Sequence, residues 1–161
     1  MSPTGRIEPA MSDPSIHLSD SPRPDELAAL YESVGWKTYT RDLDGLVQAV
    51  RNSTFVVTAR QDERLIGLAR CLSDDVSIVY LQDILVTEAC QCRGIGHRLL
   101  EACLERYAHV RNFVLLSDDR PEQHAFYAAH GLTNVAATRN PKLNAFVRIL
   151  NVSFEAENAA T

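Results

Sequence analysis

The feature that most constrains the fold is a change of periodicity around a glycine-containing turn. Residues 76–86 are rich in β-branched and apolar side chains, as in a strand. From Gly94 to about His109, apolar side chains recur at helical spacing, and residues 113–116 form a continuous apolar run typical of a buried strand. A strand, a helix and a second strand in this order form a βαβ unit, so we expect the two strands to lie parallel.

The segments before this unit favour two helices and two further strands. Apolar residues at positions i, i+3 and i+4 predict helices over 25–34 and 42–50, joined by a loop that holds two aromatic side chains. Residues 54–60 and 65–72 are extended segments separated by a polar turn. Together with residues 76–86 they predict an antiparallel meander.

The segments after the unit complete the predicted fold. Residues 121–130 predict a short helix, and residues 132–138 and 145–152 predict two closing strands. The whole pattern predicts an α/β fold with a mixed sheet, mostly antiparallel with a central parallel pair, flanked by helices.

Chain length predicts a single domain, because 161 residues suit one hydrophobic core and leave little room for a second. We expect this domain over residues 14–153. Residues 1–13 are expected to be a disordered extension, and residues 154–161 a C-terminal tail.

Charge and cysteine spacing narrow the expected partners and location. The net charge is −5 and no basic block occurs, so we expect no nucleic-acid and no anionic-membrane partner. No apolar run approaches the roughly 20 residues of a membrane span. The four cysteines contain no Cys-x-x-Cys pair, which disfavours a metal site and a disulfide framework. We therefore expect a cytoplasmic protein with reduced thiols.

Residues 91–98, Gln-Cys-Arg-Gly-Ile-Gly-His-Arg, have the composition of a phosphate-binding turn. Unpaired N–H groups at a helix start point at one spot, and the helix dipole adds partial positive charge there. Gly94 and Gly96 let the backbone approach an anion, while Arg93 and Arg98 add full charges. The alternative is a tight turn without a ligand, since a bare Gly-x-Gly is a weak signal.

Two other nucleotide-binding signatures are absent from this turn. A nicotinamide-binding turn needs a third glycine three residues after Gly96, where this chain has Leu99. The Lys-Ser/Thr pair of an ATP-binding loop is missing as well.

Two motifs give the chain a specific resemblance to a known family. Gln91-x-x-Gly94-x-Gly96, between an apolar strand and an amphipathic helix, resembles the acetyl-CoA signature of the GNAT acetyltransferase superfamily. Phe126-Tyr127-Ala128-Ala129-His130-Gly131-Leu132 is similar to that family's late helix end, with Leu in place of the usual final Phe. The resemblance covers roughly residues 27–132, and it extends to a bacterial subgroup similar to plant arylalkylamine (serotonin-type) acetyltransferases.

The resemblance implies an enzyme that uses acetyl-CoA as co-substrate and transfers the acetyl group directly to a primary amine of a small molecule. A protein Lys or N-terminal acetyltransferase and a non-catalytic acyl-CoA sensor stay open as alternatives. In the family, main-chain groups near the end of the fourth strand hold the pantetheine, and the glycine turn holds the pyrophosphate. The implied binding residues are Ile84, Leu85, Val86, Gln91, Cys92, Arg93, Gly94, Ile95, Gly96, His97, Arg98 and Phe126.

The resemblance also implies a general acid. Tyr127 matches the family's phenol, which protonates the departing thiolate; the alternative is a tyrosine that only fills space beside Phe126. The reaction further needs a hydrogen-bond donor at the carbonyl oxygen, and the family-like choice is the backbone N–H of Leu85 or Val86.

The proton acceptor is less clear from the residues. Tyr80 and Gln82 share one face of the strand, but neither is a convincing base. Asp83 falls on the other face unless a bulge intervenes, and burial of its carboxylate would favour a catalytic role. The alternative is that Asp83 makes structural hydrogen bonds only.

Six residues are candidates for the acceptor side, namely Tyr80 and Gln82 together with the following four. Trp36 and Tyr39 lie in the loop that walls the acceptor pocket in this family, although a Trp between helices also occurs in cores. Asp118 and Asp119 follow the last strand of the βαβ unit and could hold an ammonium, or they could form a solvated turn. By the same analogy we expect a homodimer, with residues 145–152 as a candidate edge.

Overall fold

The computed structural model describes residues 11–155. Most of the extension expected over 1–13, and the end of the expected tail, lie outside the described residues. The chain divides between Asp118 and Asp119 into two compact units, each described below by itself. The single domain expected over 14–153 stays a prediction.

The first unit is built on a five-stranded sheet whose strands follow one another in chain order. The strands are β1 (Ser15–His17), β2 (Phe55–Gln61), β3 (Arg64–Ser73), β4 (Ile78–Val86) and β5 (Asn112–Val114). All neighbours pair antiparallel except β4 and β5, which pair parallel. The predicted mixed sheet with one parallel pair is confirmed, but the pair lies at one end of the five-stranded sheet and not at its centre.

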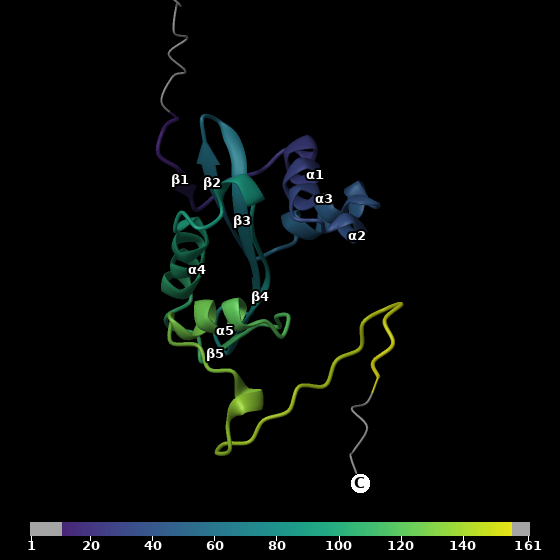
Figure 1. Cartoon of the computed structure of the whole chain (residues 1–161), viewed down its shortest axis with the longest axis vertical. Helices are drawn as coiled ribbons and strands as arrows, with labels where there is room; N and C mark the ends of the chain where they lie inside the picture. Colours follow the sequence, from purple (N-terminus) through teal and green to yellow (C-terminus); the bar gives the residue numbers. More distant parts are fainter. Residues whose placement is uncertain (1–10, 156–161) are drawn as a thin grey trace, which may run out of the picture. The chain divides into compact units, whose positions relative to one another are not determined.

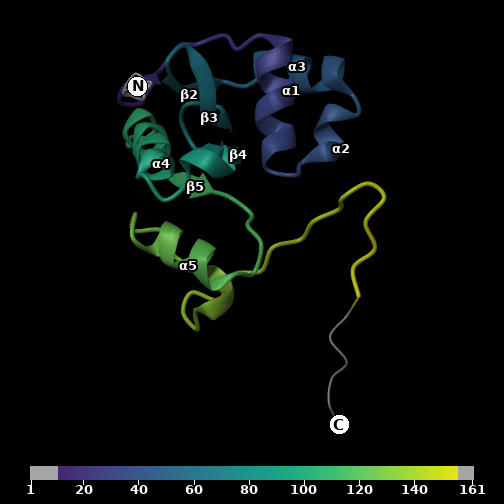
Figure 2. The ribbon, with the colours of Figure 1, turned by 45° about the horizontal axis from the view of Figure 1, so that its top comes forward.

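Helices cover both faces of this sheet (Figures 1 and 2). On one face lie α1 (Pro24–Ser33), α2 (Lys37–Thr40) and α3 (Leu43–Arg51), and on the other lies α4 (Ile95–Arg106). The helices expected over 25–34 and 42–50 are therefore confirmed. The segment expected to be a plain loop between them contains α2.

Alternation along β3 sends neighbouring side chains into the two halves of the core. Leu68 packs in a buried cluster with Leu27 and Leu30 of α1. Its neighbour Gly67 faces α4, where a Cβ would lie 3.1 Å from Leu99 Cδ1 and 3.2 Å from the Leu85 carbonyl oxygen. Glycine at this position thus allows α4 to lie close to the sheet.

The strand β5 is shorter and less buried than the sequence predicts. Only residues 112–114 pair with β4, and the side chains of Val114 and Leu116 are 39% and 51% exposed. The strand β1, in contrast, was not expected; it pairs with β2 although Ile16 is its only apolar residue. Both differences arise because strand length depends on the partner strand as well as on local composition.

The second unit contains α5 (Pro121–Ala128) and a 3₁₀ turn at Val135–Ala137. The helix predicted from Pro121 is confirmed, but the two closing strands are wrong for this structure. Residues 145–152 are irregular, and Phe146 and Leu150 are 94% and 79% exposed. Apolar alternation favours a strand, but a strand also needs a neighbour that satisfies its N–H and C=O groups.

Candidate active site

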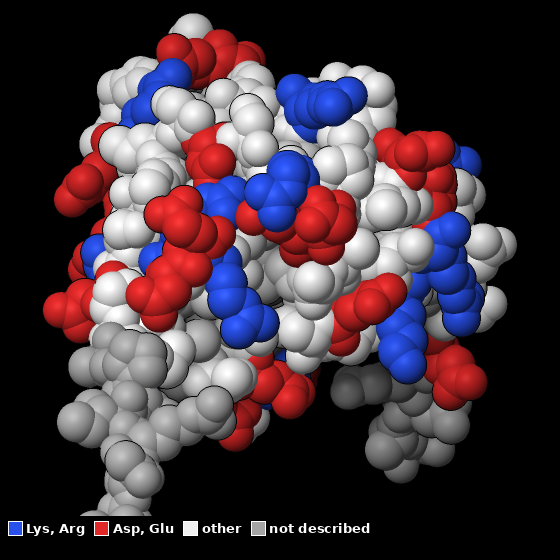
Figure 3. All heavy atoms as spheres, turned by 90° about the horizontal axis from the view of Figure 1, so that it is seen from above, with Lys and Arg blue, Asp and Glu red and all other residues white. Residues whose placement is uncertain are grey.

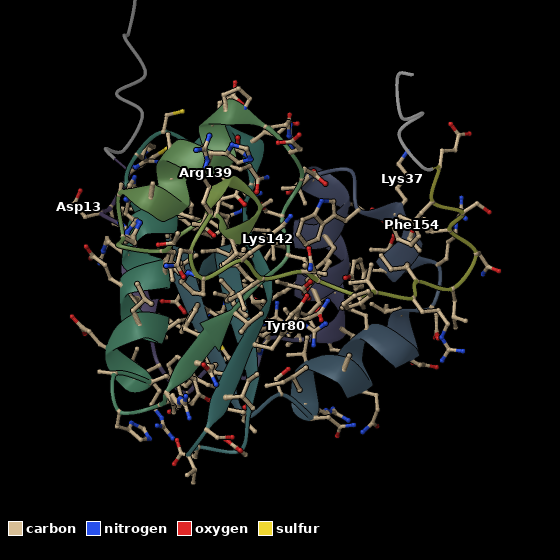
Figure 4. The ribbon with its side chains drawn as sticks, turned by 90° about the horizontal axis from the view of Figure 1, so that it is seen from below. Asp13, Lys37, Tyr80, Arg139, Lys142 and Phe154 are labelled. Atoms are coloured by element: carbon tan, nitrogen blue, oxygen red, sulfur yellow. The ribbon has the colours of Figure 1, made fainter. Side chains whose placement is uncertain are left out.

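A bulge in β4 decides which face its polar side chains occupy. Arg70 lies opposite Asp83, while Cys71 lies opposite Leu81, so Gln82 is an extra residue in β4. Tyr80, labelled in Figure 4, lies opposite Leu72. Because Arg70 and Leu72 share a face of β3, the bulge brings Asp83 onto the same face as Tyr80. The sequence left open whether a bulge places Asp83 on this face, and the structure contains that bulge.

Asp83 is a buried hydrogen-bond centre, with 2% of its surface exposed. Its carboxylate accepts hydrogen bonds from the hydroxyls of Tyr31 (2.9 Å) and Tyr39 (3.2 Å) and forms an ion pair with Arg70. Burial and the nearby carboxylate raise the pKa of both phenols, so they stay neutral donors. The geometry favours the structural alternative for Asp83, and its role as base stays a prediction.

Arg70 was not predicted as a site residue, although the sequence contains a signal for it. It is the only charged residue within the extended segment 65–72, whose other residues are apolar or glycine. A charge at such a position requires a buried partner, because an isolated ion in an apolar core is very costly. The partner, Asp83, lies 13 residues further along the chain.

Three aromatic rings pack above Asp83. The rings of Trp36 and Tyr39 are stacked with centroids 5.9 Å apart, and Tyr31 lies 5.3 Å from Tyr39. Gln82 Nε2 lies 3.5 Å from the Tyr39 hydroxyl. Trp36 remains 36% exposed. The structure therefore brings together the predicted residues Trp36, Tyr39 and Gln82, next to Asp83.

Among the described residues, the end of β4 has no partner strand on one side. The parallel ladder with β5 covers only Ile78–Tyr80, whereas β4 continues to Val86. The N–H of Thr87 donates to the Ile66 carbonyl (2.9 Å), so alternation turns the main-chain groups of Ile84 and Val86 away from β3. The N–H of Leu85 points toward β3. Of the two predicted oxyanion donors, this geometry favours Val86.

The predicted phosphate turn contains two left-handed residues and has open space beside Gly94. Cys92 (φ 59°) and Gly94 (φ 76°) have left-handed conformations, and Gly94 is the N-cap of α4. An added Cβ at Gly94 would meet no atom within 4 Å. The first hydrogen bond of the helix joins Arg98 N to Gly94 O (3.1 Å), so the preceding N–H groups have no helical acceptor. Gln91 Nε2 donates to Val86 O (2.9 Å) and ties the turn to β4.

The two arginines of this turn contact the N-terminal part of the sheet. Arg93 Nη1 donates to Gln61 Oε1 (3.3 Å), and Arg98 Nη1 donates to the Pro14 carbonyl (2.8 Å). Gln61 is 3% exposed and was not predicted from the sequence. These contacts fix the two guanidinium groups of the turn, and the sequence-based expectation that the turn holds a pyrophosphate stays a prediction.

In the second unit, α5 carries the predicted acid. The rings of Phe126 and Tyr127 meet edge to face, with centroids 5.1 Å apart. Burial raises the pKa of the Tyr127 phenol, which keeps it protonated at neutral pH. Asp119 is exposed and pairs with His124, whose Nε2 lies 3.0 Å from Asp119 Oδ1. Asp118 is exposed at the end of the first unit.

A separate cavity of about 570 Å³ lies in the first unit, and none of the predicted site residues line it. Its walls come from the segment before α1, from α3 and from the start of β2. Among residues 11–155, no group of three or more His, Cys, Asp or Glu side chains could hold a metal ion. None of the helices in that range is long and apolar enough to cross a membrane.

Charges of both signs are mixed on the face drawn in Figure 3. Ion pairing in the first unit includes Arg60, which pairs with Asp20 (2.6 Å) and Glu26 (2.7 Å). Over the described residues drawn there, the face shows no continuous basic field of the kind that attracts nucleic acid.

Comparisons with known proteins agree on one family. The model of the acetyltransferase (GNAT) family matches residues 19–132. A soybean (Glycine max) protein named histone acetyltransferase TAP1 is 30% identical over 108 residues, which are 59% of this chain and 46% of that protein. An uncharacterised N-acetyltransferase of Prochlorococcus marinus is 32% identical over 114 residues, which are 67% of this chain and 61% of that protein. The chain thus matches less than two thirds of the length of either relative.

Among solved structures, a GNAT family acetyltransferase from Streptococcus pneumoniae has the same fold. It superposes with a TM-score of 0.75 and 22% sequence identity, over 87% of this chain and all of that chain.

Proposed function

Because the chain belongs to the GNAT acetyltransferase family, we propose that it transfers the acetyl group of acetyl-CoA to the primary amine of a small molecule. The observation that carries the proposal is the left-handed turn at Cys92–Gly94 that caps α4, which leaves open space beside Gly94 and has Arg93 and Arg98 in and next to it. Acetyl-CoA supplies an acetyl group activated as a thioester.

The glycine turn is proposed to bind the pyrophosphate through the N–H groups of residues 92–97. Support comes from the left-handed φ of Cys92 and Gly94 and from the open space beside Gly94. The side of β4 that lacks a partner strand is proposed to bind the pantetheine, with Ile84 presenting its main-chain groups and Val86 its N–H there, since the Val86 carbonyl accepts from Gln91. The Val86 N–H is the proposed donor to the carbonyl oxygen of the acetyl group.

Tyr127 is proposed as the acid that protonates the departing thiolate. Its phenol remains neutral at physiological pH because burial raises its pKa, so it has a proton to give. Phe126 is proposed to contact CoA, as in the family.

The aromatic cluster of Trp36 and Tyr39 is proposed as a wall of the acceptor site. The Tyr39 hydroxyl donates its proton to Asp83, and its oxygen, which accepts a long contact from Gln82 Nε2, can also accept a hydrogen bond from an ammonium group. Trp36 is partly exposed and offers a ring face to an aromatic or aliphatic body or to a cation. These groups suit arylalkylamines, with Gln82, Tyr80, Asp118 and Asp119 as further proposed contacts.

A second candidate function is acetylation of a protein Lys or N-terminus. The observation that favours it is the soybean relative, whose name states a histone acetyltransferase. Its support is weaker, because the match covers 46% of that protein.

The test is release of free CoA thiol from acetyl-CoA in the presence of arylalkylamines, polyamines, aminoglycosides or Lys peptides. Turnover with a small amine supports the proposal, and turnover with Lys peptides alone would favour the second candidate. Acetyl-CoA binding measured by calorimetry without turnover on any amine would contradict both and favour a sensor.

A further inference from the structure

An Asp–His pair sits at the start of α5. Asp119 directly precedes Arg120, the N-cap of the helix, and His124 follows in the first turns. Helical side chains lean toward the N-terminus, so the imidazole of His124 reaches back to Asp119. The resulting contact joins His124 Nε2 to Asp119 Oδ1 at 3.0 Å.

The pair shares a helix face with the proposed acid. His124 and Tyr127 are three positions apart on α5, and residues at this spacing are neighbours on a helix surface. The His124 side chain is 42% exposed, so solvent or a small substrate can reach it. One helix face thus presents a neutral phenol and an imidazole.

The contact with Asp119 distinguishes the two ring nitrogens of His124. Because Nε2 is the nitrogen beside the Asp119 carboxylate, Nδ1 is the nitrogen that can accept a proton in the tautomer with hydrogen on Nε2. Asp83 lacks this freedom, because three donors already occupy its carboxylate in a buried site.

We propose that His124 accepts the proton of the acceptor amine, directly or through one water, and that Asp119 positions its ring. The inference rests on the proposed acetyl transfer. His124 is the catalytic residue of the pair, and Asp119 is a positioning residue.

The protons balance as follows. The ammonium gives one proton to His124 Nδ1, and the neutral nitrogen forms the N–C bond while the C–S bond breaks. The nitrogen then loses a second proton to solvent, the thiolate takes one from Tyr127, and solvent reprotonates the phenolate. His124 releases its proton to solvent, so each turnover yields an amide, free CoA thiol and one net proton from the ammonium.

The test compares His124→Gln and His124→Ala with a matched histidine. His109 is 54% exposed and also pairs with an aspartate, since its Nε2 lies 3.3 Å from Asp75 Oδ1. With an amine that the wild type acetylates, His124→Gln should lower kcat about a hundredfold. His109→Gln should leave kcat unchanged, and both variants should keep the wild-type Kd for acetyl-CoA and the wild-type Tm.

Rescue experiments distinguish a catalytic role of His124 from a purely structural one. Added imidazole should restore part of the turnover of His124→Ala, and Asp119→Glu should retain more activity than Asp119→Asn. Wild-type kcat in His124→Gln, or lost activity that imidazole does not restore, would overturn the inference while the acetyltransferase assignment stands. A wild type that binds acetyl-CoA but acetylates no amine would refute the proposed function and the inference with it.

Discussion

At the scale of single residues, the chemistry of a side chain in this protein depends on which partners it meets. Tyr31 and Tyr39 both donate to Asp83, whereas no hydrogen bond accounts for the raised pKa of Tyr127, which follows from burial alone. A tyrosine hydroxyl is therefore a structural donor at positions 31 and 39, whereas at position 127 it donates no hydrogen bond to a carboxylate among the described residues.

Tyr127→Phe should lower kcat about a hundredfold while the Kd for acetyl-CoA stays near the wild-type value. The phenyl ring keeps the contact with Phe126 and loses only the transferable proton. Steady-state kinetics and calorimetry measure the two quantities.

Tyr107→Phe is the control, because the Tyr107 hydroxyl is engaged structurally with Thr54 Oγ1 at 3.3 Å. This substitution should leave kcat unchanged. Equal kcat values for Tyr127→Phe and the wild type would remove Tyr127 as the acid.

Asp83→Asn should lower the free energy of unfolding by about 3–5 kcal/mol, because it leaves the Arg70 guanidinium buried without a counter-charge. Urea unfolding followed by circular dichroism measures the change. Asp75→Asn is the control, since Asp75 and its partner Arg106 are both largely exposed, and it should change stability little.

A small stability change in Asp83→Asn would show that the buried ion pair is not needed for folding. The base hypothesis for Asp83 would gain support if kcat then fell while the unfolding free energy stayed the same.

At the scale of elements, the turn between β4 and α4 is fixed both by its local glycine pattern and by contacts with distant residues. Gly94 takes φ 76° and caps α4, as the glycine pattern indicates. Gln91 then anchors the turn to Val86, and Arg93 anchors it to Gln61 of β2. Side-chain hydrogen bonds therefore tie the turn to β4 and β2, in addition to its place at the start of α4.

Gly94→Val should raise the Kd for acetyl-CoA roughly tenfold or more, because the new side chain fills the open space beside the turn and strains a left-handed residue. Gly35→Val is the matched control, since Gly35 has φ +78° and also meets no atom within 4 Å. Both variants carry similar backbone strain, but only Gly94→Val should lose affinity in calorimetry.

Similar affinity losses in the two variants would indicate that the effect is general destabilisation. Retained affinity in Gly94→Val would contradict the pyrophosphate assignment.

At the scale of the whole molecule, the described C-terminal segment is exceptionally apolar for an exposed one. Phe146, Leu150 and Phe154 are 94%, 79% and 62% exposed. Exposed apolar surface of this kind marks association sites in soluble proteins, and the strand-like composition of the segment suits pairing with a second copy.

We expect a homodimer that Phe146→Glu with Leu150→Glu weakens at least roughly tenfold in dimer Kd. Sedimentation velocity across a concentration series measures this constant. Val76→Glu is the control, because Val76 is 73% exposed but lies in the turn between β3 and β4. A wild type that is monomeric throughout the series would contradict the expectation.

Much of the fold was predictable because its signals are local. The spacing of Leu27, Leu30 and Tyr31 predicts α1, and these side chains are buried as a helix face requires. The closing strands were wrong because residues 145–152 have the composition of a strand but lack a paired neighbour in the structure. The strand β1 escaped prediction because three residues carry no periodicity.

In the candidate site, too, the features set by chain neighbours were predictable from the sequence, whereas the long-range contacts were not. By itself, the sequence determined the family, the strand–turn–helix unit and the chemical character of the turn, because each depends on residues that are neighbours in the chain. Only the tertiary structure decided the partners of Asp83, the bulge at Gln82 and the contact between Gln61 and Arg93. Tyr31 and Asp83 are 52 positions apart, and no local pattern specifies a contact between residues that only packing brings together.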